Sequence, residues 1–109
     1  MAIRLDCSEF TTICPVTGQP DFGRLVMHYV PGRYLVETKS LKLYLQGYRD
    51  QEGFNEQIVV RLADDLYRQI EPKWLRIVGH FHARGGIALS CQAQRGEPGD
   101  AATSLIDEK

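Results

Sequence analysis

Two side chains near the start of the sequence have the types and spacing of a nucleophile and its proton partner. Cys14 and Asp21 flank a segment, residues 15–20, in which Pro and Gly interrupt any regular helix or strand. A thiol becomes nucleophilic when its pKa is lowered or when a base accepts its proton, and a nearby carboxylate is a candidate base. An intracellular cysteine is most often a small buried apolar residue, but this loop placement beside an acid favours covalent chemistry at Cys14.

A second group of residues suits phosphate binding. Lys39 and Lys42 are three residues apart, on one flank of a helix expected to start near Ser40. Lysines beside the free amide groups of a helix start can bind phosphate. Arg84 precedes two glycines, which is typical of either a phosphate-facing turn or a plain hairpin turn. Solvated basic side chains explain the same pattern, so the charges alone leave both interpretations open.

His80 and His82 alternate on an expected strand and therefore project from one face, which Cys91 can approach across a hairpin. A metal site needs at least three converging ligands, and we predict none here. The three cysteines lack CxxC spacing, so free thiols are expected, and the sequence leaves open whether Cys7 or Cys91 forms a disulfide.

The length and charge of the chain limit what it can be. Its 109 residues, 43% of them hydrophobic, are expected to form one domain over residues 1–109. The net charge of -1 gives no attraction to nucleic acid or to an anionic membrane, so a small-molecule partner is expected. No apolar run reaches the ~18 residues of a transmembrane helix, and the first residues lack the apolar core of a signal peptide, which predicts a cytoplasmic protein.

Hydrophobic periodicity predicts the elements that hold these residues. A first hairpin is expected over residues 23–36 with its turn at 31–33. A helix then follows, capped by Ser40 or Thr38, because apolar residues recur at i, i+3, i+4 and i+7 over Leu41, Tyr44, Leu45 and Tyr48.

A second helix is expected from Phe54 to Ile70, where Pro72 ends it. Strands over 74–82 and 87–93 should form a second hairpin, and residues 95–109 should fray. The order predicts an α+β domain in which two helices cover one face of an antiparallel sheet. Exposed sheet edges would pair between subunits and close a barrel from several chains.

Together these segments resemble the short, single-domain form of the 7-cyano-7-deazaguanine reductases, the QueF family of nitrile reductases. The resemblance covers roughly residues 9–99. Its most specific part, residues 37–48, reads ETKSLKLYLQGY and matches the family signature E[SL]K[SA]xK[LY][YF]xxx[YFW] everywhere except Thr38. The Cys14 loop, Phe54-x-Glu56 and Arg84-Gly85-Gly86 occur in the family's order.

The resemblance implies a tunnelling fold (T-fold) of order ββααββ, assembled as a homo-oligomer, a pentamer-based decamer, with active sites between subunits. It implies NADPH as cofactor and 7-cyano-7-deazaguanine as substrate, in queuosine biosynthesis. Cys14 would add to the nitrile carbon to give a covalent thioimide, Asp21 would act as acid and base, and two hydride transfers would yield the amine.

The resemblance also assigns binding roles by position. Glu56 would accept hydrogen bonds from the edge of the deazaguanine ring, with Phe54 packing against the ring and Glu37 belonging to the same substrate-binding set. The residues assigned to the cofactor are Lys39, Ser40, Lys42 and, as a weaker phosphate contact, Arg84.

One site position departs from the family pattern, which has Phe-His-Glu where this chain has Phe54-Asn55-Glu56. Asparagine cannot titrate, so substrate binding and thioimide formation should survive while the hydride steps slow. Residues 90–93 also differ from the usual continuation after the Gly-Gly turn.

Three other functions are compatible with parts of this pattern. An amidine-forming enzyme would keep the thioimide but use ammonia on tRNA, which the retained Lys39 and Lys42 and the lack of basic charge disfavour. A deazapurine-binding protein with lost turnover would explain Asn55 but has no need of an activated cysteine. A pterin or GTP enzyme of the same fold would use other site residues.

Overall fold

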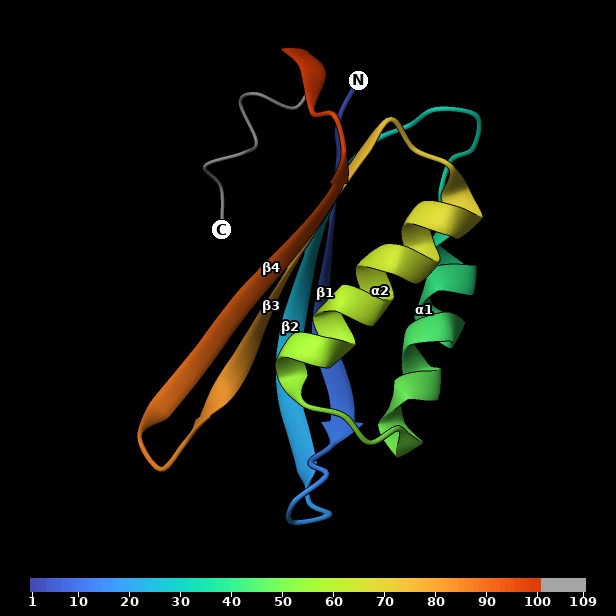
Figure 1. Cartoon of the computed structure of the whole chain (residues 1–109). Helices are drawn as coiled ribbons and strands as arrows, with labels where there is room; N and C mark the ends of the chain where they lie inside the picture. The colour runs from blue at the N-terminus through green and yellow to red at the C-terminus, as the bar shows by residue number, and fades with distance from the viewer. Residues whose placement is uncertain (101–109) are drawn as a thin grey trace.

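The computed structural model describes residues 1–100 and places them in one curved antiparallel sheet with two helices on one side (Figure 1). The four strands lie in the order β1-β2-β3-β4. The elements are β1 (Ile3–Ile13), β2 (Pro20–Val30), α1 (Thr38–Gln46), the short 3₁₀ helix η1 (Gly47–Asp50), α2 (Asn55–Ile70), β3 (Trp74–Arg84) and β4 (Ile87–Gly96). The predicted ββααββ order and α+β class are therefore confirmed.

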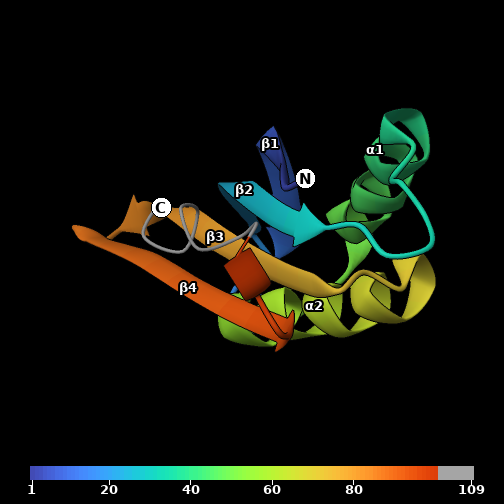
Figure 2. The same cartoon turned by 90° about the horizontal axis from the view of Figure 1, so that it is seen from above.

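The core lies between the sheet and the helices, which share one side of the sheet in the view from above (Figure 2). Alternate residues of β2 and β3 face this layer, and α2 contributes its apolar stripe to it. The buried set includes Leu25, Met27, Tyr29, Ile58, Leu62, Leu66, Leu75, Ile77 and Phe81. Full burial of each such side chain contributes about 1.5–3 kcal/mol, so this layer anchors α2 on β3 and β4.

The first hairpin differs from the prediction. β2 ends at Val30 and pairs with β1, while residues 31–37 connect the sheet to α1 instead of returning as a strand. The buried Tyr29 hydroxyl accepts a hydrogen bond from the Val36 amide at 3.0 Å, which holds this connection against the sheet. The turn of the true hairpin is the Cys14 loop, residues 14–19.

The cap of the first helix also differs from the prediction. Glu37, rather than Ser40 or Thr38, is the N-cap of α1. Its carboxylate accepts from the amides of Lys39 and Ser40 at 2.6 and 3.2 Å. The helix ends at Gln46, and Tyr48 lies in η1.

The remaining elements follow the expectation closely. α2 begins one residue after Phe54 and ends at Ile70, and β3 and β4 form the second hairpin around Gly85 and Gly86. β4 continues to Gly96, so the tail expected from Arg95 begins later. Residues 101–109 of that tail lie outside the described residues.

Gly79 of β3 permits the close approach of α2 to the sheet. A Cβ added there would lie 2.8 Å from a methyl of Val59 and 2.8 Å from the ring of Phe81. We expect Gly79→Val to lower the free energy of unfolding by about 1–3 kcal/mol, because the branched side chain overpacks this contact. Urea denaturation followed by circular dichroism measures the change.

Gly47 offers a matched control because a Cβ there meets nothing within 4 Å. Its φ of -62° is ordinary for alanine, so Gly47→Ala should leave stability unchanged or raise it by up to about 1 kcal/mol. Equal midpoints for Gly79→Val and the wild type would contradict the packing described here.

Candidate active site

The loop between β1 and β2 holds Cys14 in a closed turn. The Cys14 amide donates to the Gln19 carbonyl at 2.8 Å, and the Gly18 amide donates to the Cys14 carbonyl at 2.9 Å. Gly18 has a φ of +71°, a conformation that glycine adopts without strain. These bonds fix the backbone on both sides of the thiol, so the position of Cys14 is set by the hairpin.

The thiol of Cys14 lies among hydrogen-bond donors. The Thr17 hydroxyl, followed by the amides of Thr17 and Val16, donates to the sulfur and lowers the pKa of Cys14, while the charge of Asp21 opposes this shift. Cys7 and Cys91 differ, since partial burial raises the pKa of both thiols. All three cysteines are free thiols, and Cys14 is the one whose surroundings favour the thiolate.

Asp21 lies on β2 opposite Thr12 of β1, with its side chain 11% exposed. Arg84, at the end of β3, places its Nε 2.9 Å from Asp21 Oδ1 and donates through Nη2 to the Pro20 carbonyl. The structure thus brings Asp21, Arg84 and the Cys14 loop together at one end of the sheet. The Arg84 guanidinium therefore contacts both the Asp21 carboxylate and the backbone next to it.

The start of α2 is attached to the same end of the sheet through Ile13. The Ile13 amide donates to the Gln51 carbonyl at 3.0 Å, and the Gly53 amide donates to the Ile13 carbonyl at 3.2 Å. Because Cys14 follows Ile13 and Phe54 follows Gly53, these bonds hold the Cys14 loop beside the N-terminus of α2, at the lower end of the molecule in Figure 1.

Three predicted site residues follow at that N-terminus. The Phe54 side chain is about half exposed, and Glu56 is exposed and close enough to Cys91 to contribute to its raised pKa. Asn55 is partly buried, and its side-chain oxygen is buried without a hydrogen-bond partner among the described residues, as is the Thr12 hydroxyl. Buried polar atoms of this kind are costly and call for a partner.

The other residues predicted to bind the cofactor, on α1, lie elsewhere. Lys39 and Ser40 lie in the first turn of α1, which begins toward the opposite end of the sheet from the Cys14 loop (Figure 1). The Glu37 carboxylate already occupies the Lys39 and Ser40 amides, and the Ser40 hydroxyl donates to it at 3.0 Å. These donors, the Lys39 amide first and then the Ser40 hydroxyl, lower the pKa of Glu37. The exposed side chains of Lys39 and Lys42 are what α1 offers to an anion.

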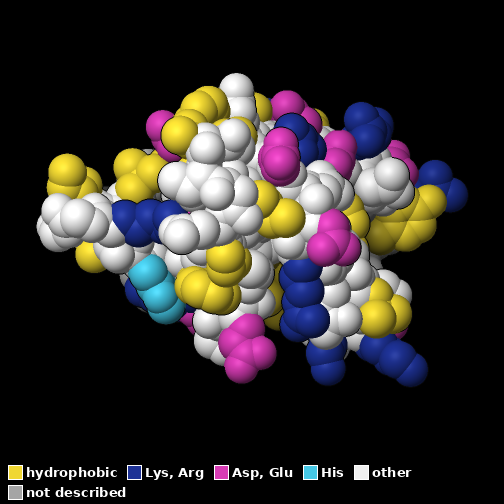
Figure 3. Space-filling view, turned by 90° about the horizontal axis from the view of Figure 1, so that it is seen from below, with side chains coloured by type: hydrophobic (Ala, Val, Ile, Leu, Met, Phe, Trp, Pro, Cys, Tyr) yellow, Lys and Arg dark blue, Asp and Glu magenta, His cyan; other side chains and the backbone are white. Residues whose placement is uncertain are grey.

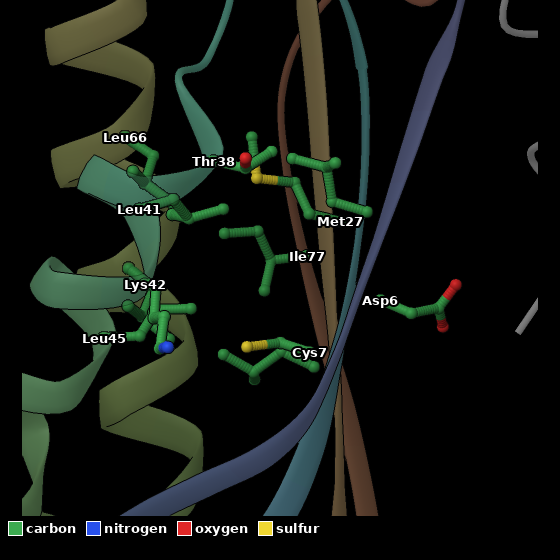
Figure 4. A pocket seen from close by; sticks show the side chains of 12 residues that line it. Asp6, Cys7, Met27, Thr38, Leu41, Lys42, Leu45, Leu66 and Ile77 are labelled. Carbon is green, nitrogen blue, oxygen red and sulfur yellow. The ribbon is translucent and has the colours of Figure 1, made fainter.

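A cavity of about 180 Å³ lies between the helices and the sheet (Figure 4). Its walls are mostly aliphatic, with Lys42 and Cys7 extending into it from opposite walls and Asp6 pointing away. Its lining includes neither Cys14 nor Asp21. The cavity is therefore a gap in the packing of α1 on the sheet, away from Cys14.

The end of the molecule that carries the Cys14 loop exposes apolar side chains among charged ones (Figure 3). Large apolar residues exposed on the segments near this end are Val16, Phe22, Phe54 and Ile87. Exposed apolar groups around a reactive group are typical of a surface that is covered by a partner or a ligand.

The histidines have neighbours of their own. His80 Nδ1 lies 2.9 Å from the Ser90 hydroxyl, and the His82 ring packs against Phe22. Within residues 1–100, no three His, Cys, Asp or Glu side chains are grouped as metal ligands would be.

In the same range, no helix has both the length and the apolar character needed to cross a bilayer.

Comparison with known proteins decides the family. The family model described as "QueF-like protein" matches residues 20–100. The chain belongs to the QueF-like family. The resemblance seen in the sequence is thereby confirmed.

Curated relatives in this family are named NADPH-dependent 7-cyano-7-deazaguanine reductase. Over 87% of this chain, identity is 48% to the protein of Anaeromyxobacter sp. (strain Fw109-5), 50% to that of Rhodopseudomonas palustris (strain BisB5) and 52% to that of Methylorubrum extorquens (strain PA1). The matched region spans 78%, 60% and 62% of these relatives. The chain thus corresponds to about three fifths of two of them.

Among solved structures, the apo crystal structure of the archaeosine synthase QueF-Like has the same fold. The TM-score is 0.82 at 19% identity, covering 88% of this chain and 94% of that one.

Two residues of this QueF-like chain that lie near Cys14 or Asp21 were not predicted from the sequence as site residues. Thr17 donates to the Cys14 sulfur, and Thr12 lies buried opposite Asp21. A hydroxyl residue three positions after a turn cysteine is a usable signal for Thr17. Nothing comparable marks Thr12, because its burial depends on strand pairing.

We expect Thr17→Val to raise the pKa of Cys14, since it removes the first donor that stabilises the thiolate. The pH profile of Cys14 alkylation by iodoacetamide, followed by peptide mass spectrometry, should shift to higher pH. Thr17→Ser keeps the hydroxyl and should retain the wild-type profile. A valine variant with an unshifted profile would show that the hydroxyl does not act on the sulfur.

Proposed function

We propose that this protein is an NADPH-dependent nitrile reductase that converts 7-cyano-7-deazaguanine to 7-aminomethyl-7-deazaguanine, a step of queuosine biosynthesis. The observation that carries the proposal is Cys14, whose pKa is lowered in a loop that leads into β2 beside Asp21. It is supported by 48–52% identity to relatives that bear this activity in their names.

The first step forms a covalent bond between the protein and the substrate. The Cys14 thiolate attacks the nitrile carbon, an S–C bond forms, and one of the two C–N π bonds breaks. Asp21 accepts the proton of the Cys14 thiol and passes it to the nitrogen, so no net proton is gained or lost in this step. The product is a thioimide, whose protonated form accepts a hydride more readily than a nitrile does.

Bound NADPH would supply hydride, and two hydrides, one from each of two cofactor molecules, would bring the carbon from the nitrile to the amine oxidation level. Between them the S–C bond breaks and Cys14 leaves as thiolate, so the protein is regenerated. Lys39 and Lys42 fit the cofactor because their cationic side chains are exposed on one helix flank. The amide groups of α1 fit less well, because Glu37 occupies two of them.

Substrate recognition is assigned to the N-terminus of α2. The Glu56 carboxylate accepts hydrogen bonds from adjacent N–H groups of the deazaguanine ring, and Phe54 offers an exposed ring face for stacking. The buried oxygen of Asn55 and the buried hydroxyl of Thr12, both without partners in the described residues, are further groups that a polar ligand can satisfy.

The complete site requires more than one copy of the chain in this proposal. Cys14 and Glu56 lie at one end of the sheet and Lys39 near the other. β1 and β4 are edge strands, so edge pairing between copies of this single domain would close a barrel and bring the two ends of neighbouring copies together. We propose the pentamer-based decamer of the T-fold for this assembly.

A deazapurine-binding protein without turnover is the second candidate, favoured by Asn55 alone. An amide at this position binds a ligand without supplying a proton. The lowered pKa of Cys14 favours the reductase, because a binding protein gains nothing from a thiolate.

Mass spectrometry of the intact protein with 7-cyano-7-deazaguanine tests the covalent step. We expect an adduct of one substrate mass on Cys14 that disappears when NADPH is added, with the amine as product. Cys14→Ala should form no adduct, while Cys7→Ser, which alters a thiol facing the helix layer, should form it normally. An adduct that persists with NADPH would favour the binding protein, and an adduct on Cys14→Ala would contradict the assigned nucleophile.

Asn55→His tests the proton supply during reduction. A titratable imidazole should raise the rate of thioimide reduction by up to roughly 10²-fold, as general acids do, while adduct formation changes little. Single-turnover measurements with preformed adduct separate the two steps. Asn55→Gln is the control, since it keeps the amide, and an equal rate for the histidine and wild-type proteins would show that position 55 supplies no proton.

A further inference from the structure

Arg84 is the cation that meets the Asp21 carboxylate. Its Nε lies 2.9 Å from Asp21 Oδ1, and its Nη2 donates to the Pro20 carbonyl, the residue just before Asp21 in β2. Two donors of one planar guanidinium therefore hold both the carboxylate and the backbone that carries it. This two-point contact fixes orientation more firmly than a single charge would.

The fold brings Arg84 to this position from a distant part of the sequence. The regular register of β3 with β4 is interrupted between Phe81 and Arg84, and pairing resumes at Arg84 with Ile87. Gly85 and Gly86 have φ values of +60° and +83°, so the chain reverses at once after Arg84. Hairpin geometry thus presents the guanidinium to the start of β2.

Because Asp21 is mostly buried, its ion pair with Arg84 matters for the stability of its charged form. The Asp21 side chain is 11% exposed and the Arg84 side chain 44% exposed. A carboxylate largely removed from water is costly without a paired cation or hydrogen-bond donors. Because Arg84 is the more exposed partner, replacing Arg84 should disturb the core less than replacing Asp21 would.

We propose that Arg84 is a positioning residue, which holds the Asp21 carboxylate against the Cys14 loop, instead of a contact for a cofactor phosphate. The proposal rests on the proposed function in one respect, the assignment of Asp21 to proton transfer. The ion pair and its effect on the thiol exist without any substrate.

The electrostatic consequence can be measured at the sulfur. Among the described residues, Asp21 is the charged group that acts on Cys14, and its negative charge raises the pKa of that thiol. The Arg84 cation offsets this charge. Removing the cation leaves the carboxylate uncompensated, so the pKa of Cys14 should rise and less thiolate should be present near neutral pH.

The test is the pH profile of iodoacetamide alkylation of the full-length protein, resolved by peptide mass spectrometry. We expect Arg84→Gln to shift the Cys14 profile to higher pH and to slow alkylation at pH 7.5 by roughly two- to fivefold, the scale of a partly exposed charge interaction. Cys7 and Cys91 serve as internal references whose profiles should not move. Asp21→Asn combined with Arg84→Gln should abolish the shift, because the carboxylate that causes it is gone.

Arg84→Lys keeps the charge but cannot reproduce the two-point contact, so it should fall between the wild type and Arg84→Gln. If Arg84→Gln does not fold, Arg84→Lys alone tests the positioning role of Arg84. A wild-type alkylation profile in Arg84→Gln, or in the lysine variant when it stands alone, would overturn the positioning role.

Steady-state kinetics separate this proposal from the phosphate alternative. For a positioning residue we expect kcat to fall with the KM for NADPH within about twofold of wild type, because the cofactor is not touched. A KM for NADPH raised tenfold with an unchanged alkylation profile would assign Arg84 to the cofactor. If the wild-type protein reduces no nitrile, the proposed function fails while the alkylation experiment still decides the role of Arg84.

Discussion

The geometry of the candidate site depends on two backbone hydrogen bonds at Ile13. They join the last residue of β1 to Gln51 and Gly53, the segment just before α2. Without them, the Cys14 loop and the N-terminus of α2 would belong to separate layers of the molecule. With them, a hairpin turn and a helix start share one rigid frame, which α2 secures further by packing on β3 and β4.

Surroundings, more than sequence spacing, distinguish the three thiols. Cys7 faces the helix layer and Cys91 lies near Glu56, and burial raises the pKa of both. Cys14 lies in a turn whose donors point at sulfur. A turn achieves this because consecutive amides that find no partner within a strand or helix can converge on one atom.

The sequence predicted the parts of the fold that depend on local pattern. α2 and the β3–β4 hairpin follow from periodicity and from Pro72 and Gly85, and the family follows from residues 37–48. The first hairpin was missed although polar and apolar residues alternate along β1 as in a strand, because Pro31-Gly32 offered a strong turn signal after Val30. The Glu37 cap was missed because serine and threonine are the usual caps. The Arg84–Asp21 pair was beyond prediction, since it depends on strand register and on the interruption after Phe81.

In the proposed reaction, Asn55 makes the placement of Asp21 more consequential. A histidine at position 55, as in the family pattern, would give this reaction a second titratable group beside Asp21. Asparagine can hold an intermediate through its amide but cannot exchange a proton with it. Under the proposed function, proton delivery to the sulfur and to the nitrogen then depends on the Asp21 carboxylate, which would serve both atoms from one position. A carboxylate that serves two atoms needs a more exact position than one that serves a single atom, so the proposed positioning of Asp21 by Arg84 would matter more here than beside a histidine.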